Sequence, residues 1–228
     1  MKTGRYRYKK NCVRPGGRLA DCQQVEDRSA LVCQNLQELP PNQKLRNLVD
    51  LYKRDWRCCF CKRLTGFANL SFGEAINYAA AGKEFDGKSH NCHLRHPTRK
   101  SLTAGRTALS KQKRQLKNCI TFDDLFSKVK CIVTKPRISG LGEMYFYDAA
   151  LRIGAAHNGK PIWPDKVYLP RGAKTGAQNL NSALRLGLDF GNGTIEKRRL
   201  PPELQCLTAY EIEDFFCIFK EPLSHCQT

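Results

Sequence analysis

The sequence predicts a mainly α-helical protein with little β-structure, and three observations indicate this fold class. Capping boxes, in which Ser or Thr is followed three residues later by Glu, open apolar segments at Ser71–Glu74 and Thr208–Glu211. After Thr121, two acidic residues stand in what would be the first helical turn, where the helix dipole favours negative charge. The second capping box is followed by apolar residues with the spacing of one buried helix face: Ile212, Phe215, Phe216 and Phe219.

We expect a helix after each of these starts, one extended segment at Val167–Leu169, and no internal repeat. The chain has 228 residues, enough for one domain with a real core or for two small ones. We divide it into a basic, Cys/His-rich region at 1–118 and a more regular helical domain at 119–228. A structural zinc ion would suit the first region, which carries few strong helix signals.

The charge of the chain indicates a polyanionic partner. Lys and Arg number 39 against 21 Asp and Glu, a net charge of +18. Residues 1–20 carry seven cations and residues 95–117 carry eight, with no acid in either stretch. A field of this size attracts nucleic acid or anionic membranes. We find no apolar run long enough to span a membrane, no basic amphipathic helix and no lipidation motif, so we expect nucleic acid and no membrane partner.

The N-terminal residues are charged and lack the apolar core of a secretory signal, so we expect a cytoplasmic protein. Its twelve cysteines should then be reduced. Four of them sit among apolar neighbours and are expected to behave as small buried hydrophobic residues: Cys119, Cys131, Cys206 and Cys217.

A glycine-rich turn at 138–142 is the most informative stretch. Gly140 and Gly142 allow a tight turn with positive φ angles, and we expect the next helix to run from about Glu143 to Gly154. Free amides at that helix start would form an anion site. The alternative is an ordinary corner between two helices that needs glycine only to turn.

This stretch resembles the helix-hairpin-helix motif of DNA-binding proteins, such as the DNA glycosylase superfamily. The resemblance covers residues 121–153, with Ile138 and Leu141 as the apolar residues that hold the hairpin; the sequence departs from the motif at 135–137, where a proline lengthens the approach. The glycosylases' catalytic residues are not matched. Asp165 does not fall on the position of their catalytic Asp, and Met144 stands where bifunctional members have Lys. The resemblance therefore implies DNA binding without the chemistry.

Residues 121–220 also resemble uncharacterised bacterial proteins. The recurring pieces are 147–154, 167–169 and 211–215. This resemblance brings no known function with it.

A zinc site is a second hypothesis. Cys58 and Cys61 form a C-x-x-C pair, and a His- and Cys-containing loop follows at 90–96. Thiolates and imidazoles with such spacing can hold zinc in a tetrahedron. Our preferred ligand set is Cys58, Cys61, Cys92 and His96. The alternative is that these are core cysteines beside a basic, His-rich loop.

We therefore expect a protein that binds the phosphate backbone of nucleic acid, with DNA favoured over RNA. Two alternatives remain open: a nucleic-acid-processing enzyme, such as a nuclease that uses a metal or the histidines at 90–96 or a glycosylase-like protein, or a partner-binding module that uses the acidic C-terminal helix. The candidate nucleic-acid-binding residues are Lys135, Arg137, Ser139, Gly140, Leu141, Gly142, Glu143 and Arg152 around the hairpin, with Arg99, Lys100, Arg106, Lys111, Lys113 and Arg114 before it.

Overall fold

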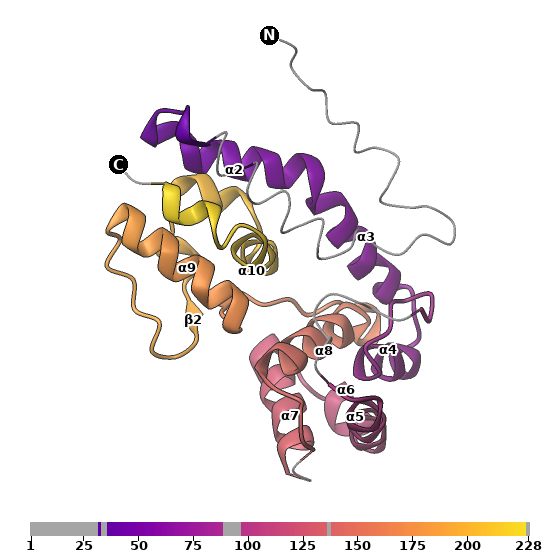
Figure 1. Cartoon of the computed structure of the whole chain (residues 1–228). Coiled ribbons are helices and arrows are strands. Elements are labelled where there is room, and N and C mark those ends of the chain that lie inside the picture. Colours follow the sequence, from indigo (N-terminus) through magenta and orange to yellow (C-terminus); the bar gives the residue numbers. More distant parts are fainter. Residues whose placement is uncertain (1–31, 33–35, 89–96, 136–137, 227–228) are drawn as a thin grey trace.

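The computed structural model describes residues 32, 36–88, 97–135 and 138–226, and it is mainly helical, as the sequence predicts (Figure 1). None of the helices in these ranges is long and apolar enough to cross a membrane. The elements are α2 (Pro41–Asp55), α3 (Arg57–Ala68), α4 (Phe72–Ala80), α5 (Arg99–Lys111), α6 (Lys113–Lys117), α7 (Phe122–Thr134), α8 (Glu143–Ala155), η1 (His157–Gly159), β1 (Val167–Tyr168), α9 (Arg171–Leu184), β2 (Thr194–Ile195), η2 (Lys197–Arg199), η3 (Pro202–Cys206), α10 (Ala209–Ile218) and η4 (Pro222–His225).

Side-chain caps define several helix starts, which confirms three of the expected ones. In the capping box of α4, the Ser71 amide donates to Glu74 Oε2 at 3.0 Å, and the Glu74 amide donates to Ser71 Oγ. The box of α10 has the same two bonds between Thr208 and Glu211. Thr121 caps α7 by accepting from the Asp124 amide. These bonds satisfy amides that have no partner inside the helix.

The buried apolar side chains form two clusters. The first joins the end of α3 with α4, α5, α6, α7 and α8. The second joins α2 with β1, α9, α10 and the 3₁₀ turns η3 and η4. The packing therefore divides between α2 and α3 and again at β1, whereas the division expected from the sequence falls at residue 118.

Helices α2 and α3 link the two clusters. They follow each other in nearly one line, the indigo-to-purple rod of Figure 1, and are separated at Trp56. Leu48 and Tyr52 of α2 are buried in the second cluster, whereas Leu64 and Phe67 of α3 are buried in the first.

The short segment β1 also joins the clusters. It pairs antiparallel with β2, with Val167 opposite Ile195. Val167 belongs to the second cluster, while the ring of Tyr168 packs on Phe122, Phe126 and Tyr147 of the first. Its successive side chains point to opposite faces, so two residues reach both cores.

Helix α8 ends one residue later than expected, and Gly154 is not its terminating glycine. The backbone of residues 160–162 lies directly against this glycine: a Cβ there would be 2.7 Å from the Ile162 carbonyl oxygen. The Ile162 amide donates to the Gly154 carbonyl at 3.0 Å. Gly154 is needed because of this close backbone approach.

Candidate nucleic-acid interface

The turn between α7 and α8 has the two glycines in different conformations. Gly140 has φ +80°, a conformation that residues with a side chain rarely adopt. Gly142 is extended, with φ −113°, and is the N-cap of α8 without a side-chain cap. The positive φ that we considered for Gly142 is therefore wrong, and nothing lies within 4 Å of where its Cβ would be. Leu141 is buried and Ile138 half-buried, which suits residues that hold a hairpin.

The turn packs against α5, and a glycine makes this contact close. A Cβ on Gly105 would lie 2.5 Å from the Tyr145 hydroxyl and 2.9 Å from a Leu141 methyl. At the tip, a Cβ on Gly140 would lie 3.7 Å from Ser101 Oγ. The fold thus brings the hairpin and the start of the predicted basic stretch together, although the sequence separates them.

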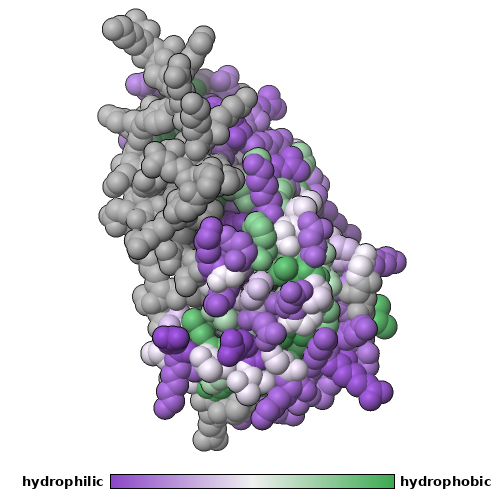
Figure 2. All heavy atoms as spheres, turned by 90° about the vertical axis from the view of Figure 1, so that its right-hand side faces the viewer, coloured by the Kyte–Doolittle hydropathy of each residue, from purple (hydrophilic) through white to green (hydrophobic). Residues whose placement is uncertain are grey.

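The basic residues of α5 and α6 face solvent and define what we call the α5 face. All six that we predicted to bind nucleic acid are exposed, and residues 97–120 contain no acid. Figure 2 shows the side of the molecule where α4 and α5 lie, with hydrophilic side chains over most of its described surface. The α5 face consists of Arg99, Lys100, Arg106, Lys111, Lys113 and Arg114.

An open groove of about 560 Å³ lies between α4 and α5. Among the residues that the structure describes, three cations line it, Lys83, Arg106 and Lys111, and no acidic residue does. The other lining residues carry polar groups that can donate hydrogen bonds: Asn77, Tyr78, Thr107 and Ser110. The sequence analysis missed Lys83 and the residues of α4, because they lie outside the two basic stretches.

The remaining residues predicted at the hairpin differ in their exposure and in their contacts. Lys135 and Ser139 are exposed, and Arg137 lies outside the described residues. Glu143 is exposed at the first position of α8, where its carboxylate pairs with Lys130 at 3.0 Å. This carboxylate occupies the end of the helix to which a phosphate would be attracted.

The assignment of Arg152 to the hairpin surface is wrong, because Arg152 is buried. It pairs with Asp148 at 3.2 Å, lies 4.0 Å from Glu84, and donates to the Lys83 carbonyl. Its guanidinium also stacks over Phe67. This arginine is part of an internal charge network.

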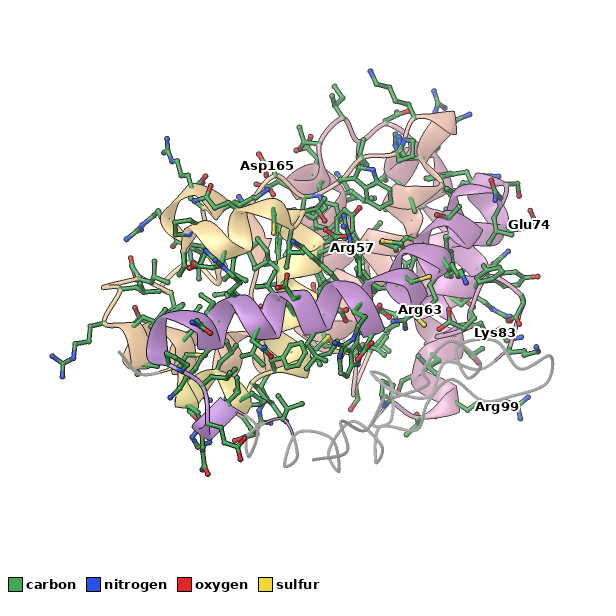
Figure 3. All side chains as sticks on the ribbon, turned by 90° about the horizontal axis from the view of Figure 1, so that it is seen from above. Arg57, Arg63, Glu74, Lys83, Arg99 and Asp165 are labelled. Carbon is green, nitrogen blue, oxygen red and sulfur yellow. The ribbon has the colours of Figure 1, made fainter. Side chains whose placement is uncertain are left out.

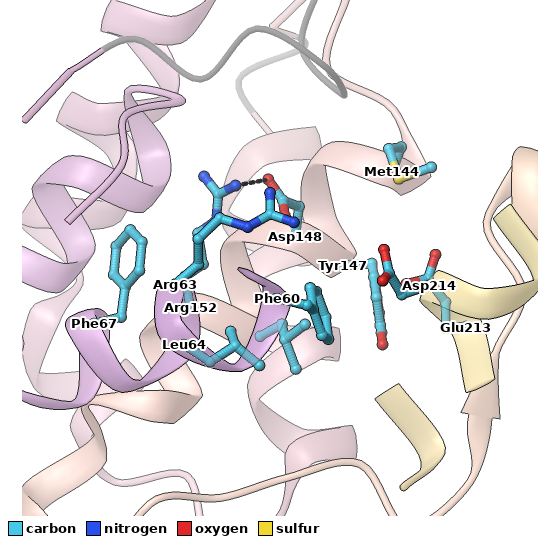
Figure 4. Close-up of a pocket in the computed structure, with 11 residues that line it drawn as sticks. Phe60, Arg63, Leu64, Phe67, Met144, Tyr147, Asp148, Arg152, Glu213 and Asp214 are labelled. Atoms are coloured by element: carbon cyan, nitrogen blue, oxygen red, sulfur yellow. Dashed lines mark ion pairs between the residues drawn. The ribbon is translucent and has the colours of Figure 1, made fainter. Parts of the chain in front are cut away.

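That network surrounds a small cavity between α3, α8 and α10 (Figure 4). The free volume is about 20 Å³, room for one water molecule. Four buried atoms of its lining residues have no hydrogen-bond partner among the described residues: Arg63 Nε, Tyr147 Oη, Asp148 Oδ2 and Glu213 Oε1. Of these, Asp148 Oδ2 still has the Arg152 guanidinium as its ion-pair partner. The stretches 147–154 and 211–215 therefore meet at this cavity.

Burial has the largest effect on the pKa values of the acids around this cavity. It raises the pKa of Asp214 to about 6, although the Arg63 charge and the hydrogen bond from Tyr52 lower it. Burial, together with the charges of Asp214 and Asp148, raises the pKa of Glu213 well above its usual value. Burial acts against the charge of Glu211 as well, but the bonds from Thr208 and Arg57 outweigh it and lower that pKa.

The acidic side chains of α10 are consequently not an interaction surface. Glu211, Glu213 and Asp214 are all at most 5 % exposed. The partner-binding module that we considered could therefore not use these three acids as its contact residues.

Only two of the four predicted zinc ligands lie among the residues that the structure describes. Cys58 and Cys61 lie one turn apart on α3, and the Cys61 thiol donates to Glu211 Oε1 at 3.6 Å. Cys92 and His96 lie outside the described residues, as do His90 and His93. No group of three or more potential metal ligands occurs among the residues that the structure describes.

Other cysteines also differ from expectation. Cys59 is disulfide-bonded, whereas we expected reduced thiols. Cys119 is buried as expected, but Cys131 and Cys206 are exposed and Cys217 is half-buried.

No family model, no curated protein and no solved structure matches this chain. Its function must therefore be argued from its own residues.

Proposed function

We propose that this protein binds nucleic acid, with DNA favoured, by holding backbone phosphates along the α5 face and the neighbouring hairpin. The observation that carries the proposal is the groove between α4 and α5, where Lys83, Arg106 and Lys111 converge and no acid of the described part of the chain joins them. Three cations and several hydroxyl and amide donors suit a chain of phosphates, because phosphate oxygens are charged acceptors.

The hairpin extends this surface. Gly142 provides no side-chain cap for α8, so a phosphate could accept from the first amides of α8, at the positive end of the helix dipole, if it displaced the Glu143 carboxylate. Exposed Arg99 and Lys100 begin the helix that the hairpin tip contacts. A backbone that runs from the groove to the hairpin would meet cations or amide donors along its whole path. The preference for DNA rests on the helix-hairpin-helix resemblance.

The test is the removal of two groove cations. We expect Arg106→Ala/Lys111→Ala to bind duplex DNA at least about tenfold more weakly. Its dependence of affinity on salt should also be shallower by about two units of slope, since each lost phosphate contact removes about one. Fluorescence anisotropy titrations at several salt concentrations measure both quantities.

A matched control removes the same charge elsewhere. Arg198 and Arg199 are exposed in η2, next to β2 at the other end of the molecule in Figure 1. Arg198→Ala/Arg199→Ala should change affinity much less than the groove variant. Equal losses in both variants would contradict a defined interface, and affinity that does not depend on salt would contradict phosphate binding altogether.

A further inference from the structure

Three aromatic rings form a continuous series that the proposed phosphate surface does not explain. Trp163 packs on Tyr210 with ring centroids 5.1 Å apart, and Tyr210 packs on Phe60 at 5.9 Å. The three residues come from the segment before β1, from α10 and from α3, so the fold assembles what the sequence keeps apart. We call Trp163, Tyr210 and Phe60 the aromatic run.

The aromatic run is open to solvent. Trp163 is 36 % exposed, one of three large hydrophobic residues exposed among those the structure describes. Tyr210 and Phe60 are partly buried. Other rings of the molecule, such as Phe67 and Phe215, are fully buried core residues. Trp163 therefore keeps part of its ring in contact with solvent, where it is available for stacking.

The charges open to solvent beside the run are mostly positive. Arg57 is 42 % exposed and Arg63 is 24 % exposed, whereas Glu211, the partner of Arg57, is 1 % exposed. The guanidinium of Arg63 lies 5.6 Å from the centre of the Phe60 ring. Asp165 is an exposed acid near Trp163 in the chain. The two guanidinium groups are more open to solvent than their acidic partners, Glu211 and Glu84.

The run is also connected to the groove. Arg63 lies 4.0 Å from Glu84, the residue that follows Lys83 of the groove. Figure 3 shows Arg57, Arg63, Lys83 and Arg99 following one another across the molecule. In this view Arg63 lies between Arg57 and Lys83, so we expect a nucleic-acid backbone that leaves the groove at Lys83 to reach Arg63 and the aromatic run next.

We propose that the aromatic run binds the unpaired bases of a single strand, whose phosphates lie on Arg63, Lys83 and the groove. This inference rests on the proposed function and specifies its substrate class. Exposed rings stack on bases of any sequence, and adjacent cations hold the backbone; together these are the two components of single-strand binding. Bases within a duplex are paired and stacked on one another, so their faces are not open to Trp163.

The test compares a single strand with a duplex. Trp163→Leu removes the stacking surface but keeps an apolar side chain, so the fold should survive, as a thermal melt can verify. We expect its affinity for a short oligothymidylate to fall about tenfold, the effect of one lost base stack. Affinity for a duplex of the same length should change less than twofold. Trp163→Phe, which keeps a ring, should restore most of the single-strand affinity.

Phe85→Ala is the matched control. Phe85 is 39 % exposed but lies against Gly66 of α3, outside the run. This variant should bind both oligonucleotides like the parent protein. Quenching of tryptophan fluorescence by oligothymidylate should also decrease in Trp163→Leu, which retains Trp56.

The outcomes separate the two proposals. If Trp163→Leu binds oligothymidylate like the parent while duplex binding still depends on the groove cations, the inference about single strands is wrong and the proposed function stands. Equal losses for single strand and duplex would also overturn the inference, because stacking on unpaired bases cannot explain them. If the parent protein binds neither oligonucleotide, the proposed function fails, and the inference fails with it.

Discussion

Glu213 and Asp214 are neighbours on α10, and at the residue scale their burial links folding to pH. Their raised pKa values favour the protonated forms in the folded chain. The stability that these protonated acids contribute is fully present below the usual carboxyl pKa. It is lost as the pH rises through the pKa of the folded state. For Asp214 that window extends from 3.8 to about 6. Between these values the free energy of unfolding should fall with increasing pH.

Glu213→Gln tests this linkage. Glutamine has nearly the shape of the protonated acid but cannot ionise, so above the usual carboxyl pKa the variant folds without having to take up a proton or bury a charge. We expect a free energy of unfolding higher than that of the parent by on the order of 1 kcal/mol at pH 8, and little difference at pH 4. Urea unfolding at both pH values measures this. The exposed Glu221→Gln is the control; a Glu213→Gln that is less stable at pH 8 would contradict the argument.

Single residues also show which features of the site could be predicted from the sequence and which could not. The exposed cations of α5 could be predicted because they stand in an acid-free stretch. The burial of Arg152 could not, because it depends on Glu84 and Phe67, which are distant in the chain. The residues next to an arginine in the sequence do not show whether it pairs with an acid inside the protein or stays exposed and can bind a phosphate.

The hairpin makes a prediction at the scale of an element. Gly140→Val places a side chain at φ +80° and should destabilise the protein by about 1–3 kcal/mol. Gly142→Val meets open space and extended backbone, so it should cost only about 1 kcal/mol, as a weaker N-cap, while it hinders a phosphate from approaching α8. Thermal melts and DNA titrations on both variants separate stability from binding. Unchanged DNA affinity in a folded Gly142→Val would exclude the hairpin from the interface.

Elements were predictable where their signals are local. The caps at Ser71, Thr121 and Thr208 act within four residues, and each starts the expected helix. Helices α2 and α3 lack side-chain caps, and α2 begins directly after Pro40. Their stability comes instead from packing against segments far along the chain, which the sequence alone does not specify.

The two clusters make a prediction for the whole molecule. The second cluster combines residues of α2 with residues after 167, and the first combines α4 and α5 with α7 and α8. A fragment of residues 119–228 would therefore lack α2, which completes the second cluster, and α4 and α5, which complete the first. We expect it to unfold without a cooperative transition in a thermal melt followed by circular dichroism, and the complete chain to show one. A cooperative transition in the fragment would instead support the division expected at residue 118.

The same distribution shows why composition does not predict which parts of the chain pack together. Charge and cysteine content change near residue 118, but buried contacts follow three-dimensional packing rather than composition. The groove is a further example, since Tyr78 and Arg106 become neighbours only when α4 packs on α5.

The hydrogen bond from Tyr52 to Asp214 spans 162 residues, and this separation has a consequence during protein synthesis. A ribosome that adds roughly 5–20 residues per second needs roughly 10–30 s to make the intervening chain. Throughout that interval the apolar side of α2 has no native partner from α10 to cover it. The nascent chain must therefore carry an uncovered helix for many seconds, which makes α2 a natural target for chaperones before the second cluster closes.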